Sequence, residues 1–188
     1  DKRLRLARAG ACAVLGGSRR DVLWQVAALD RDPASLFARM RGTPASPLPP
    51  MSALEETLAD YASSGLTTGP HVMAHLREHL RGLGVVTSAE LRQVPHGHRA
   101  RIAGHVITRQ RPGTARGMLF LTLEDETGTC NAVIIPPVFR HHRRLFHTGR
   151  LLLVEGPVQK VDGVIHVKGV CFREIQLPGA TPPSHDFL

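Results

Sequence analysis

The chain has 188 residues, of which 42% are hydrophobic and 21% charged, an ordinary composition for a globular protein with one large or two small cores. No stretch approaches the roughly 20 apolar residues needed to cross a bilayer, and the first ten residues lack the apolar segment of a signal peptide. These features exclude a membrane-spanning protein, so we expect a cytoplasmic one with no membrane partner. Cys12, Cys130 and Cys171 are widely spaced and predict buried free thiols, not a disulfide framework or a zinc motif.

The formal net charge of +8 is unevenly distributed along the chain. Residues 1–47 contain nine Lys and Arg and four acids, residues 48–97 three and five, and residues 98–175 twelve and six. A basic segment favours a polyanionic partner, because phosphates that are neutralised release their counterions. The alternative is an arginine-rich proteome that raises the charge everywhere, and the acidic middle segment argues weakly against it.

The first thirty residues predict a helical hairpin. Residues 3–15 are helix-compatible, Gly16 and Gly17 interrupt the pattern, and Ser18 stands where the N-cap of a second helix, residues 19–29, is expected. Because two short helices cannot bury enough surface alone, we expect this piece to end a domain that begins upstream, and the chain to be a fragment. The following residues 31–51 are rich in Pro, Ala and Ser and predict an irregular linker.

Residues 52–97 predict a helical connector that packs against the domain after it. Ser52 and Glu55 match a capping box at the start of one helix, and the segment 87–90 matches a second. Between them, apolar residues at helical spacing predict a helix over residues 70–83.

Residues 98–175 predict a small β-barrel. Alternating or β-branched patterns predict strands, a helical period predicts one helix, and Asp-Gly predicts a hairpin turn. In chain order we expect strands at 101–108, 118–124 and 130–135, a helix at 137–148, and strands at 150–159 and 163–174. This order is that of the OB-fold, a five-stranded Greek-key barrel that binds oligonucleotides. The expected fold is therefore α+β in several parts, with a C-terminal OB-fold at 98–175 and a tail at 176–188.

A basic loop between the first two strands supplies the candidate nucleic-acid-binding residues. If the leucines of the second strand face the core, its phenylalanine faces outward and offers a stacking surface, which contributes roughly 1–3 kcal/mol per base. Alternatively, each arginine is a solvated loop charge and the phenylalanine belongs to the core. Only 4% of the residues are aromatic, so we expect weak and mostly electrostatic binding. The candidates are Arg101, Arg109, Arg111, Arg116 and Phe120.

Two clusters of titratable residues do not predict a catalytic site. The acidic run 124–126 lies at a strand end, where neighbouring side chains diverge, and we interpret it as a solvated turn. His141, His142 and His147 miss the i, i+4 spacing of a helical zinc site, and we interpret them as surface residues. We therefore expect no catalytic residue, metal ligand or cofactor in this chain.

The chain resembles two groups of known proteins. Its barrel residues are similar to the OB modules of anticodon-binding domains in class II aminoacyl-tRNA synthetases. Nearly the whole chain resembles error-prone bacterial family C DNA polymerases, the alpha-subunit-like enzymes of damage-induced mutagenesis. LARAGACAVLGGSRRDVLW is similar to the end of their tandem helix-hairpin-helix region, ADYASSGLTTGPHVMAHLR to their connector, RQRPGTARGMLFLTLEDETGTCN to their barrel, and residues 184–187 to their terminal S-R-D-F. His185 replaces the usual arginine, and the final Leu188 also departs from the family.

The polymerase resemblance implies the C-terminal DNA-binding and partner-binding region of a translesion polymerase, with residues 1–30 ending its helix-hairpin-helix region. The catalytic carboxylates, and the Mg²⁺ expected for the full-length enzyme, would lie upstream. The implied partners are single-stranded or primer-template DNA, the sliding clamp and other mutagenesis proteins. The alternative is a protein-interaction module with little affinity for DNA, and an anticodon-binding domain is a third reading.

Overall fold

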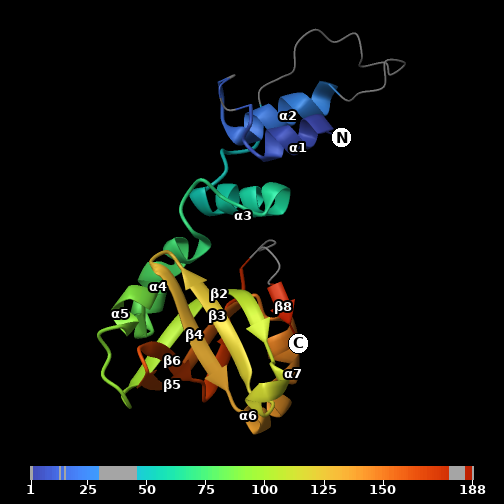
Figure 1. The fold of residues 1–188 in the computed structure, drawn as a ribbon. Helices are drawn as coiled ribbons and strands as arrows, with labels where there is room; N and C mark the ends of the chain where they lie inside the picture. The colour runs from blue at the N-terminus through green and yellow to red at the C-terminus, as the bar shows by residue number, and fades with distance from the viewer. Residues whose placement is uncertain (1, 13, 15, 30–45, 178–184, 188) are drawn as a thin grey trace. The chain divides into compact units, whose positions relative to one another are not determined.

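The computed structural model describes residues 2–12, 14, 16–29, 46–177 and 185–187. The chain divides into two compact units, residues 1–69 and 70–188 (Figure 1). None of the helices in the described ranges is long and apolar enough to cross a membrane. Most of the expected linker at 31–51, and residues 178–184 and 188 of the expected tail, lie outside the described residues.

The first unit contains three helices. They are α1 (Lys2–Arg8), α2 (Arg19–Leu29) and α3 (Ala53–Ser64). The helix expected at 3–15 ends early, at Arg8, and Gly10 follows with a positive φ of 75°. Ser18 caps α2 as expected: its Oγ accepts a hydrogen bond from the Asp21 backbone N at 3.2 Å, and the Asp21 carboxylate accepts one from the Ser18 backbone N at 3.0 Å.

The segment 52–97, expected to form one helical connector, is divided between the two units: residues 52–69 belong to the first and residues 70–97 to the second. The capping box of Ser52 and Glu55 at the start of α3 is confirmed. Arg19, on α2, places its Nη1 2.7 Å from Asp60 Oδ1 and 3.1 Å from the Glu56 carbonyl oxygen. Because these largely buried contacts fasten α3 to α2, the first part of the connector belongs with the preceding helices.

The second unit begins with short elements. They are η3 (Val72–Leu76, a 3-10 helix), α4 (Arg77–Gly82), β1 (Val85–Val86) and α5 (Ser88–Leu91). The helix expected over 70–83 is therefore a 3-10 turn followed by a short α-helix. The second capping box, between Thr87 and Glu90, is confirmed at the start of α5.

The strands of the second unit join into one sheet. The remaining elements of this unit, strands and helices together, are β2 (Arg99–Gln110), η4 (Gly113–Ala115), β3 (Leu119–Asp125), β4 (Gly128–Ile134), α6 (Pro136–His141), α7 (Arg143–Thr148), β5 (Leu151–Val161), β6 (Val164–Lys168), β7 (Cys171–Glu174) and β8 (His185–Phe187). Pairing runs from β2 through β3, β4, β6 and β5 and returns to β2, and only the β4–β6 pair of these five is parallel. Three strands, a helical segment and two strands thus follow one another in the expected order.

Two expected elements are each split. The helix at 137–148 consists of α6 and α7, which meet at His142. The last strand at 163–174 consists of β6 and β7, with the break after Lys168. At this break the backbone of Lys168 lies so close to Gly156 of β5 that a Cβ atom at position 156 would be only 1.9 Å from the Lys168 carbonyl oxygen. The chain therefore crosses close over Gly156 at this point and changes its partner residues on β5. The hairpin turn is confirmed, with Asp162 and Gly163 at φ 51° and 78°.

The barrel core contains the leucine face of β3, as expected. Leu119, Leu121 and Leu123 are fully buried, whereas Phe120 alternates with them on the outer face and is half-buried. Phe139 and Phe146, seven residues apart on α6 and α7, are buried and stack with their ring centroids 6.1 Å apart. The alternative that Phe120 belongs to the core is therefore wrong.

A buried carboxylate ties the short helices to the barrel, and this corrects the interpretation of residues 124–126 as a solvated turn. Asp125 is 3% exposed. It accepts hydrogen bonds from the backbone N of Ser88 and of Thr127, both at 2.7 Å, and lies 3.4 Å from Arg77 Nη2. Arg77 also pairs with Glu126. Since Ser88 begins α5 and Arg77 begins α4, this one side chain holds both helices against the β3–β4 turn.

Replacing this carboxylate should destabilise the second unit. We expect Asp125→Ala to lower its free energy of unfolding by about 3 kcal/mol. The change leaves the buried backbone N of Ser88 without its acceptor and removes one of the two carboxylates that pair with the buried Arg77. Guanidinium unfolding followed by NMR signals of barrel residues measures the change. Glu124→Gln is the matched control, since that side chain is 43% exposed and its replacement should cost at most about 0.5 kcal/mol. Equal stabilities for the two variants would contradict the anchoring role.

The cysteines are free, as expected, but only Cys130 is buried; Cys12 is half-buried and Cys171 is exposed. Cys171 therefore departs from the expectation of buried thiols. Burial raises the pKa of Cys130 to about 11, so the folded state favours its thiol form.

Alkylation of the folded protein should distinguish these thiols. At pH 8 we expect iodoacetamide to modify Cys171 quickly and to leave Cys130 unmodified until the protein unfolds. Peptide mass spectrometry of the folded and the guanidinium-treated protein gives the result. Alkylation of Cys130 as fast as Cys171 in the folded protein would contradict this assignment.

The raised pKa of Cys130 also predicts how stability depends on pH. Because the pKa is raised in the folded state, the contribution of Cys130 to stability should be complete at neutral pH and decline as the pH rises above about 8.5.

Candidate nucleic-acid interface

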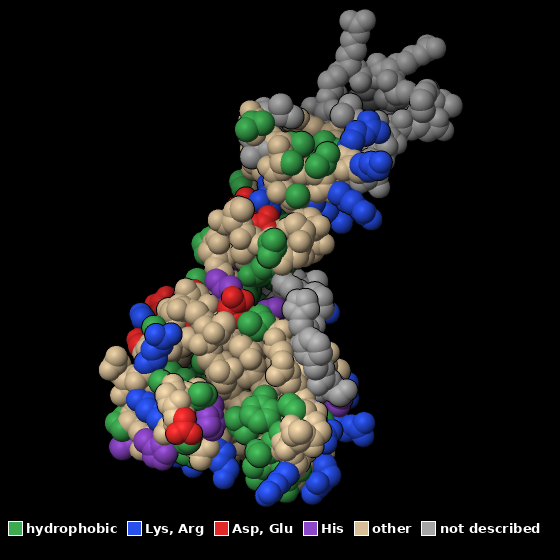
Figure 2. All heavy atoms as spheres, viewed as in Figure 1, with side chains coloured by type: hydrophobic (Ala, Val, Ile, Leu, Met, Phe, Trp, Pro, Cys, Tyr) green, Lys and Arg blue, Asp and Glu red, His purple; other side chains and the backbone are tan. Residues whose placement is uncertain are grey.

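The outer face of β3 and β4 carries one aromatic side chain among small and polar ones. Phe120 lies opposite Gln110 on β2 and opposite Val133 on β4. In the view of Figure 2, apolar side chains gather on the barrel beside the mostly uncharged surface of these strands. The one carboxylate on the outer face of β3 is that of Glu124, four residues from Phe120. A half-buried ring flanked by neighbouring strands is held in place from both sides, which suits it to stack against a base.

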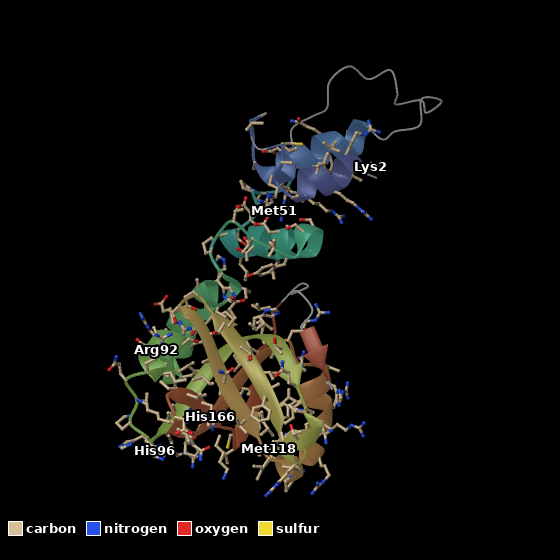
Figure 3. All side chains as sticks on the ribbon, in the orientation of Figure 1. Lys2, Met51, Arg92, His96, Met118 and His166 are labelled. Atoms are coloured by element: carbon tan, nitrogen blue, oxygen red, sulfur yellow. The ribbon has the colours of Figure 1, made fainter. Side chains whose placement is uncertain are left out.

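Polar groups continue this face across the sheet. Thr122 Oγ1 lies 3.0 Å from Asn131 Oδ1, and Asn131 is paired in register with His166 on β6. His166 Nε2 lies 3.0 Å from Gln159 Oε1 on β5, and Figure 3 labels His166 on the barrel. Burial lowers the pKa of His166, so its imidazole is neutral near pH 7. This row offers hydrogen-bonding groups to base edges. The sequence alone does not reveal this row, because the parallel pairing of β4 with β6 links residues far apart in the chain.

Two of the predicted arginines lie in the β2–β3 loop beside this face. Arg111 and Arg116 are exposed. The Arg111 guanidinium carbon lies 4.5 Å from the centroid of the Phe139 ring, a cation–π contact that orients it. Arg116 has a left-handed backbone at φ 50° and precedes Gly117 at φ 78°, so the loop turns tightly before β3. The structure therefore brings Arg111, Arg116 and Phe120 to the same end of the β2–β3 hairpin.

Arg109 does not belong to that loop, and its placement there is wrong. It is a residue of β2 and is 2% exposed. Its Nε donates to the Phe146 carbonyl oxygen at 2.7 Å, its Nη2 donates to the Gly149 carbonyl oxygen, and its Nη1 lies 3.1 Å from Asp186 Oδ1. A guanidinium that is buried and bound in this way serves the end of α7, and it is not on the surface where a phosphate could reach it.

The described part of the tail forms a strand on the barrel. β8 pairs in parallel with β2, placing Thr108 beside His185 and Gln110 beside Phe187. Asp186 at its centre is the carboxylate partner of Arg109. The buried cation thus explains why the tail binds at this edge of β2.

Arg101 lies apart from the other candidates. Its Nε is 2.7 Å from Glu155 Oε2 on β5, and its Nη1 donates to the Leu83 carbonyl oxygen at 2.8 Å. The hydrogen bond from Arg101 lowers the pKa of Glu155, so this carboxylate is ionised at neutral pH. Arg101 is therefore half-exposed but already paired, on the side of β2 that faces β1 and β5.

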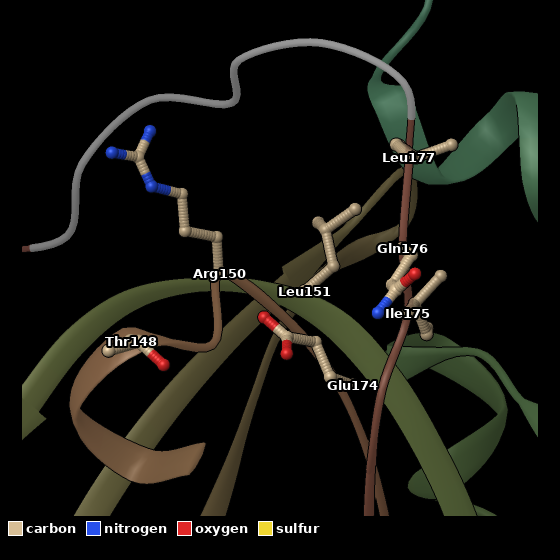
Figure 4. Close-up of a pocket in the computed structure, with 7 residues that line it drawn as sticks. All are labelled: Thr148, Arg150, Leu151, Glu174, Ile175, Gln176 and Leu177. Carbon is tan, nitrogen blue, oxygen red and sulfur yellow. The ribbon is translucent and has the colours of Figure 1, made fainter. Parts of the chain in front are cut away.

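The described residues contain no group of three or more His, Cys, Asp or Glu side chains that could hold a metal ion. A cavity of about 370 Å³ lies between the start of β5 and the segment after β7 (Figure 4). Arg150 and Glu174 are the charged residues in its lining.

Neutralising the tail carboxylate should release β8. We expect Asp186→Asn to weaken the bond to Arg109 Nη1, because a charge-assisted hydrogen bond is roughly twice as strong as a neutral one. Hydrogen exchange should then accelerate at the backbone amides of residues 185–187 and at the paired residues of β2. Asp162→Asn is the matched control, since it removes the same charge at an exposed hairpin turn where asparagine tolerates the left-handed backbone. Unchanged exchange in both variants would show that the ion pair does not hold the tail.

Comparison with known proteins agrees with this geometry. A family model described as an OB-fold nucleic acid binding domain matches residues 100–177, which together with the strand pairing confirms the OB-fold. A protein named error-prone DNA polymerase from Anaeromyxobacter sp. (strain K) is 39% identical over 179 residues, covering 95% of this chain and 16% of that protein. A second of the same name, from Aromatoleum aromaticum, is 44% identical over 163 residues, covering 87% of this chain and 15% of that protein.

The chain thus spans about a sixth of the length of these relatives. The polymerase resemblance seen in the sequence is confirmed by these matches. Among solved structures, asparaginyl-tRNA synthetase from Pyrococcus horikoshii is 27% identical, with 50% of this chain and 24% of that chain covered and a TM-score of 0.43. That score is too low for the synthetase to inform the function of this chain.

Proposed function

We propose that this chain, a homologue of one segment of the error-prone DNA polymerases, binds single-stranded DNA on the outer face of β3 and β4. The observation that carries the proposal is the position of Phe120, which projects from the barrel between Gln110 and Val133, with Arg111 and Arg116 in the adjoining loop. The ring stacks on a base while the two guanidinium groups bind phosphates. Asn131 and His166 hydrogen-bond to neighbouring base edges.

The proposed role in the whole protein is to hold the template or primer-template DNA near a polymerase active site that lies in other residues. Nucleotidyl transfer with Mg²⁺, translesion synthesis in the cytoplasm, and work with the sliding clamp and other mutagenesis proteins are parts of this proposal. The helices α1 and α2 would end a helix-hairpin-helix region. The support is the identity to polymerases across both units of the chain.

A second candidate function is docking of protein partners. Two observations favour it: aromatic residues are few, at 4% of the chain, and the edge of β2 already accepts an extended segment, β8. Added strands are a common mode of peptide recognition. A pull-down with mutagenesis proteins, run beside a DNA titration of the same chain, separates the two functions. Capture of partners by a chain that leaves single-stranded DNA free at low salt would favour docking.

Binding to a fluorescent oligo-dT should depend on both the ring and the loop charges. We expect Phe120→Ala to weaken binding by roughly 5- to 100-fold, the equivalent of removing one stacked base. Arg111→Glu with Arg116→Glu should weaken it further and reduce the dependence of log K on log salt by about 1.4, at roughly 0.7 for each phosphate that is no longer neutralised. Fluorescence anisotropy between about 50 and 300 mM salt, the range over which this dependence is steep, measures both effects.

Arg109 is left out of this variant because its substitution would disturb the barrel and the tail. Arg173→Glu with Arg81→Glu is the matched control, since both are exposed, lie away from the loop in sequence and change the net charge by the same amount. Binding that survives the Phe120 and loop changes, or that falls equally in the control, would refute the proposed interface.

A further inference from the structure

The segment that closes the barrel carries a second, separate set of positive charges. Between Glu126 and Glu155 the sequence has no acidic residue but four arginines. Three of them, Arg140, Arg143 and Arg144, lie on α6 and α7 and are exposed. In the view of Figure 2, blue side chains without red neighbours gather at the end of the barrel where Figure 1 shows α6.

Helical spacing places these arginines on the side of α6 and α7 that the core does not use. The bond from His142 N to the Val138 carbonyl ends α6, and the bond from Phe146 N to the His142 carbonyl begins α7, so the two short helices meet at His142. Phe139 and Phe146 point into the core, and positions 140, 143, 144 and 147 recur on another face at intervals of three and four residues. We call Arg140, Arg143 and Arg144 the helix arginines.

The helix arginines are not neutralised within the described structure. The ion pairs found among the described arginines involve Arg19, Arg20, Arg77, Arg99, Arg101 and Arg109. No carboxylate lies within ion-pair distance of a helix arginine in the same described ranges. Three adjacent cations that repel one another and have no internal partner need an external reason to be grouped, and a polyanion supplies it.

The chemistry of this surface differs from that of the β3–β4 face. Its phenylalanines are inside: Phe139 is 5% and Phe146 1% exposed. The exposed rings beside the arginines are the smaller imidazoles of His141 and His147, so this surface lacks an outward phenylalanine like Phe120. A cluster of exposed arginines is suited above all to phosphates, because each guanidinium can donate two parallel hydrogen bonds to phosphate oxygens. A DNA duplex, whose bases are already stacked on one another, presents only its backbone and grooves to such a surface.

We propose that the helix arginines bind the phosphate backbone of double-stranded DNA, adjacent to the single strand on the β3–β4 face. The placement of the duplex beside a bound single strand rests on the proposed function, whereas the binding of duplex DNA by the helix arginines does not. Arg111 connects the two surfaces, because it belongs to the β2–β3 loop and stacks on Phe139 of α6. The ligand that fits both surfaces is a junction between duplex and single strand, with the duplex on α6 and α7.

Three labelled DNAs test this arrangement on the full chain by anisotropy: oligo-dT, a blunt hairpin duplex, and the same hairpin with a single-stranded overhang. The variant is Arg143→Gln with Arg144→Gln, and the matched control is Arg81→Gln with Arg173→Gln, which changes the net charge equally. We expect the helix variant to bind the blunt hairpin and the junction about ten-fold more weakly, with a salt slope reduced by about 1.8, and to bind oligo-dT as the original chain does. Phe120→Ala should show the reverse preference, weakening oligo-dT and leaving the blunt hairpin unchanged.

The outcomes separate this inference from the proposed function. Duplex binding that disappears in the helix variant supports the duplex site even if the original chain fails to bind oligo-dT, an outcome that would refute only the single-strand interface. No binding of the original chain to the blunt hairpin overturns the inference, whether or not oligo-dT binds. Equal weakening in the helix variant and its control also overturns it, because net charge alone would then explain the affinity.

Discussion

The buried carboxylate of Asp125 is the group on which the arrangement of the second unit depends. A charge at 3% exposure is tolerated only when it is paired and fully hydrogen-bonded, and Asp125 meets this condition with groups from α4, α5 and its own turn. The short helices have little surface with which to fold alone. Their position against the barrel therefore comes from the same side chain that ends β3. The β3–β4 hairpin, which carries the candidate interface, is in turn held at its turn by those helices.

Arg109 shows the same principle with the opposite charge. Its side chain reaches the carbonyl ends of α7 and the carboxylate of the tail, so one buried cation satisfies acceptors from two segments far apart in sequence. The arginines that remain outside, Arg111 and Arg116 in the loop, have no such carboxylate partner among the described ion pairs. The barrel thus separates its positive charges into those that hold the fold and those that face solvent.

The solvent-facing groups are themselves of two kinds. On β3 and β4 an outward Phe120 is surrounded by neutral hydrogen-bonding side chains, which suits binding to unpaired bases. On α6 and α7 the phenylalanine rings are buried and the arginines face out. The same helical period that buries Phe139 and Phe146 to close the barrel exposes the arginines between them. The proposed division between single-strand and duplex binding therefore follows from how the two elements use their aromatic residues.

The sequence by itself determined the order of the barrel elements, the leucine face of β3, the capping boxes and the Asp162-Gly163 turn. Each of these depends on side chains within a few residues of one another, through the two-residue period of a strand, the geometry of a helix end or the φ angles of a turn. Local pattern also placed Arg111 and Arg116 in the loop, but it left open whether Phe120 faces outward or belongs to the core. It could not separate Arg109 from them, since a strand residue and a loop residue two positions apart look alike in composition.

Only the tertiary structure decided which charges are buried and which segments pair. The burial of Asp125 and Arg109 depends on Arg77 and Asp186, which lie 48 and 77 residues away in the chain. The division of the last strand depends on the close crossing of Lys168 over Gly156, and the polar row on β4 and β6 depends on a parallel pairing between non-neighbouring strands. A one-dimensional pattern records the period of each element and the chemistry of its side chains. It does not record the distance between elements, and burial and charge pairing are set by that distance.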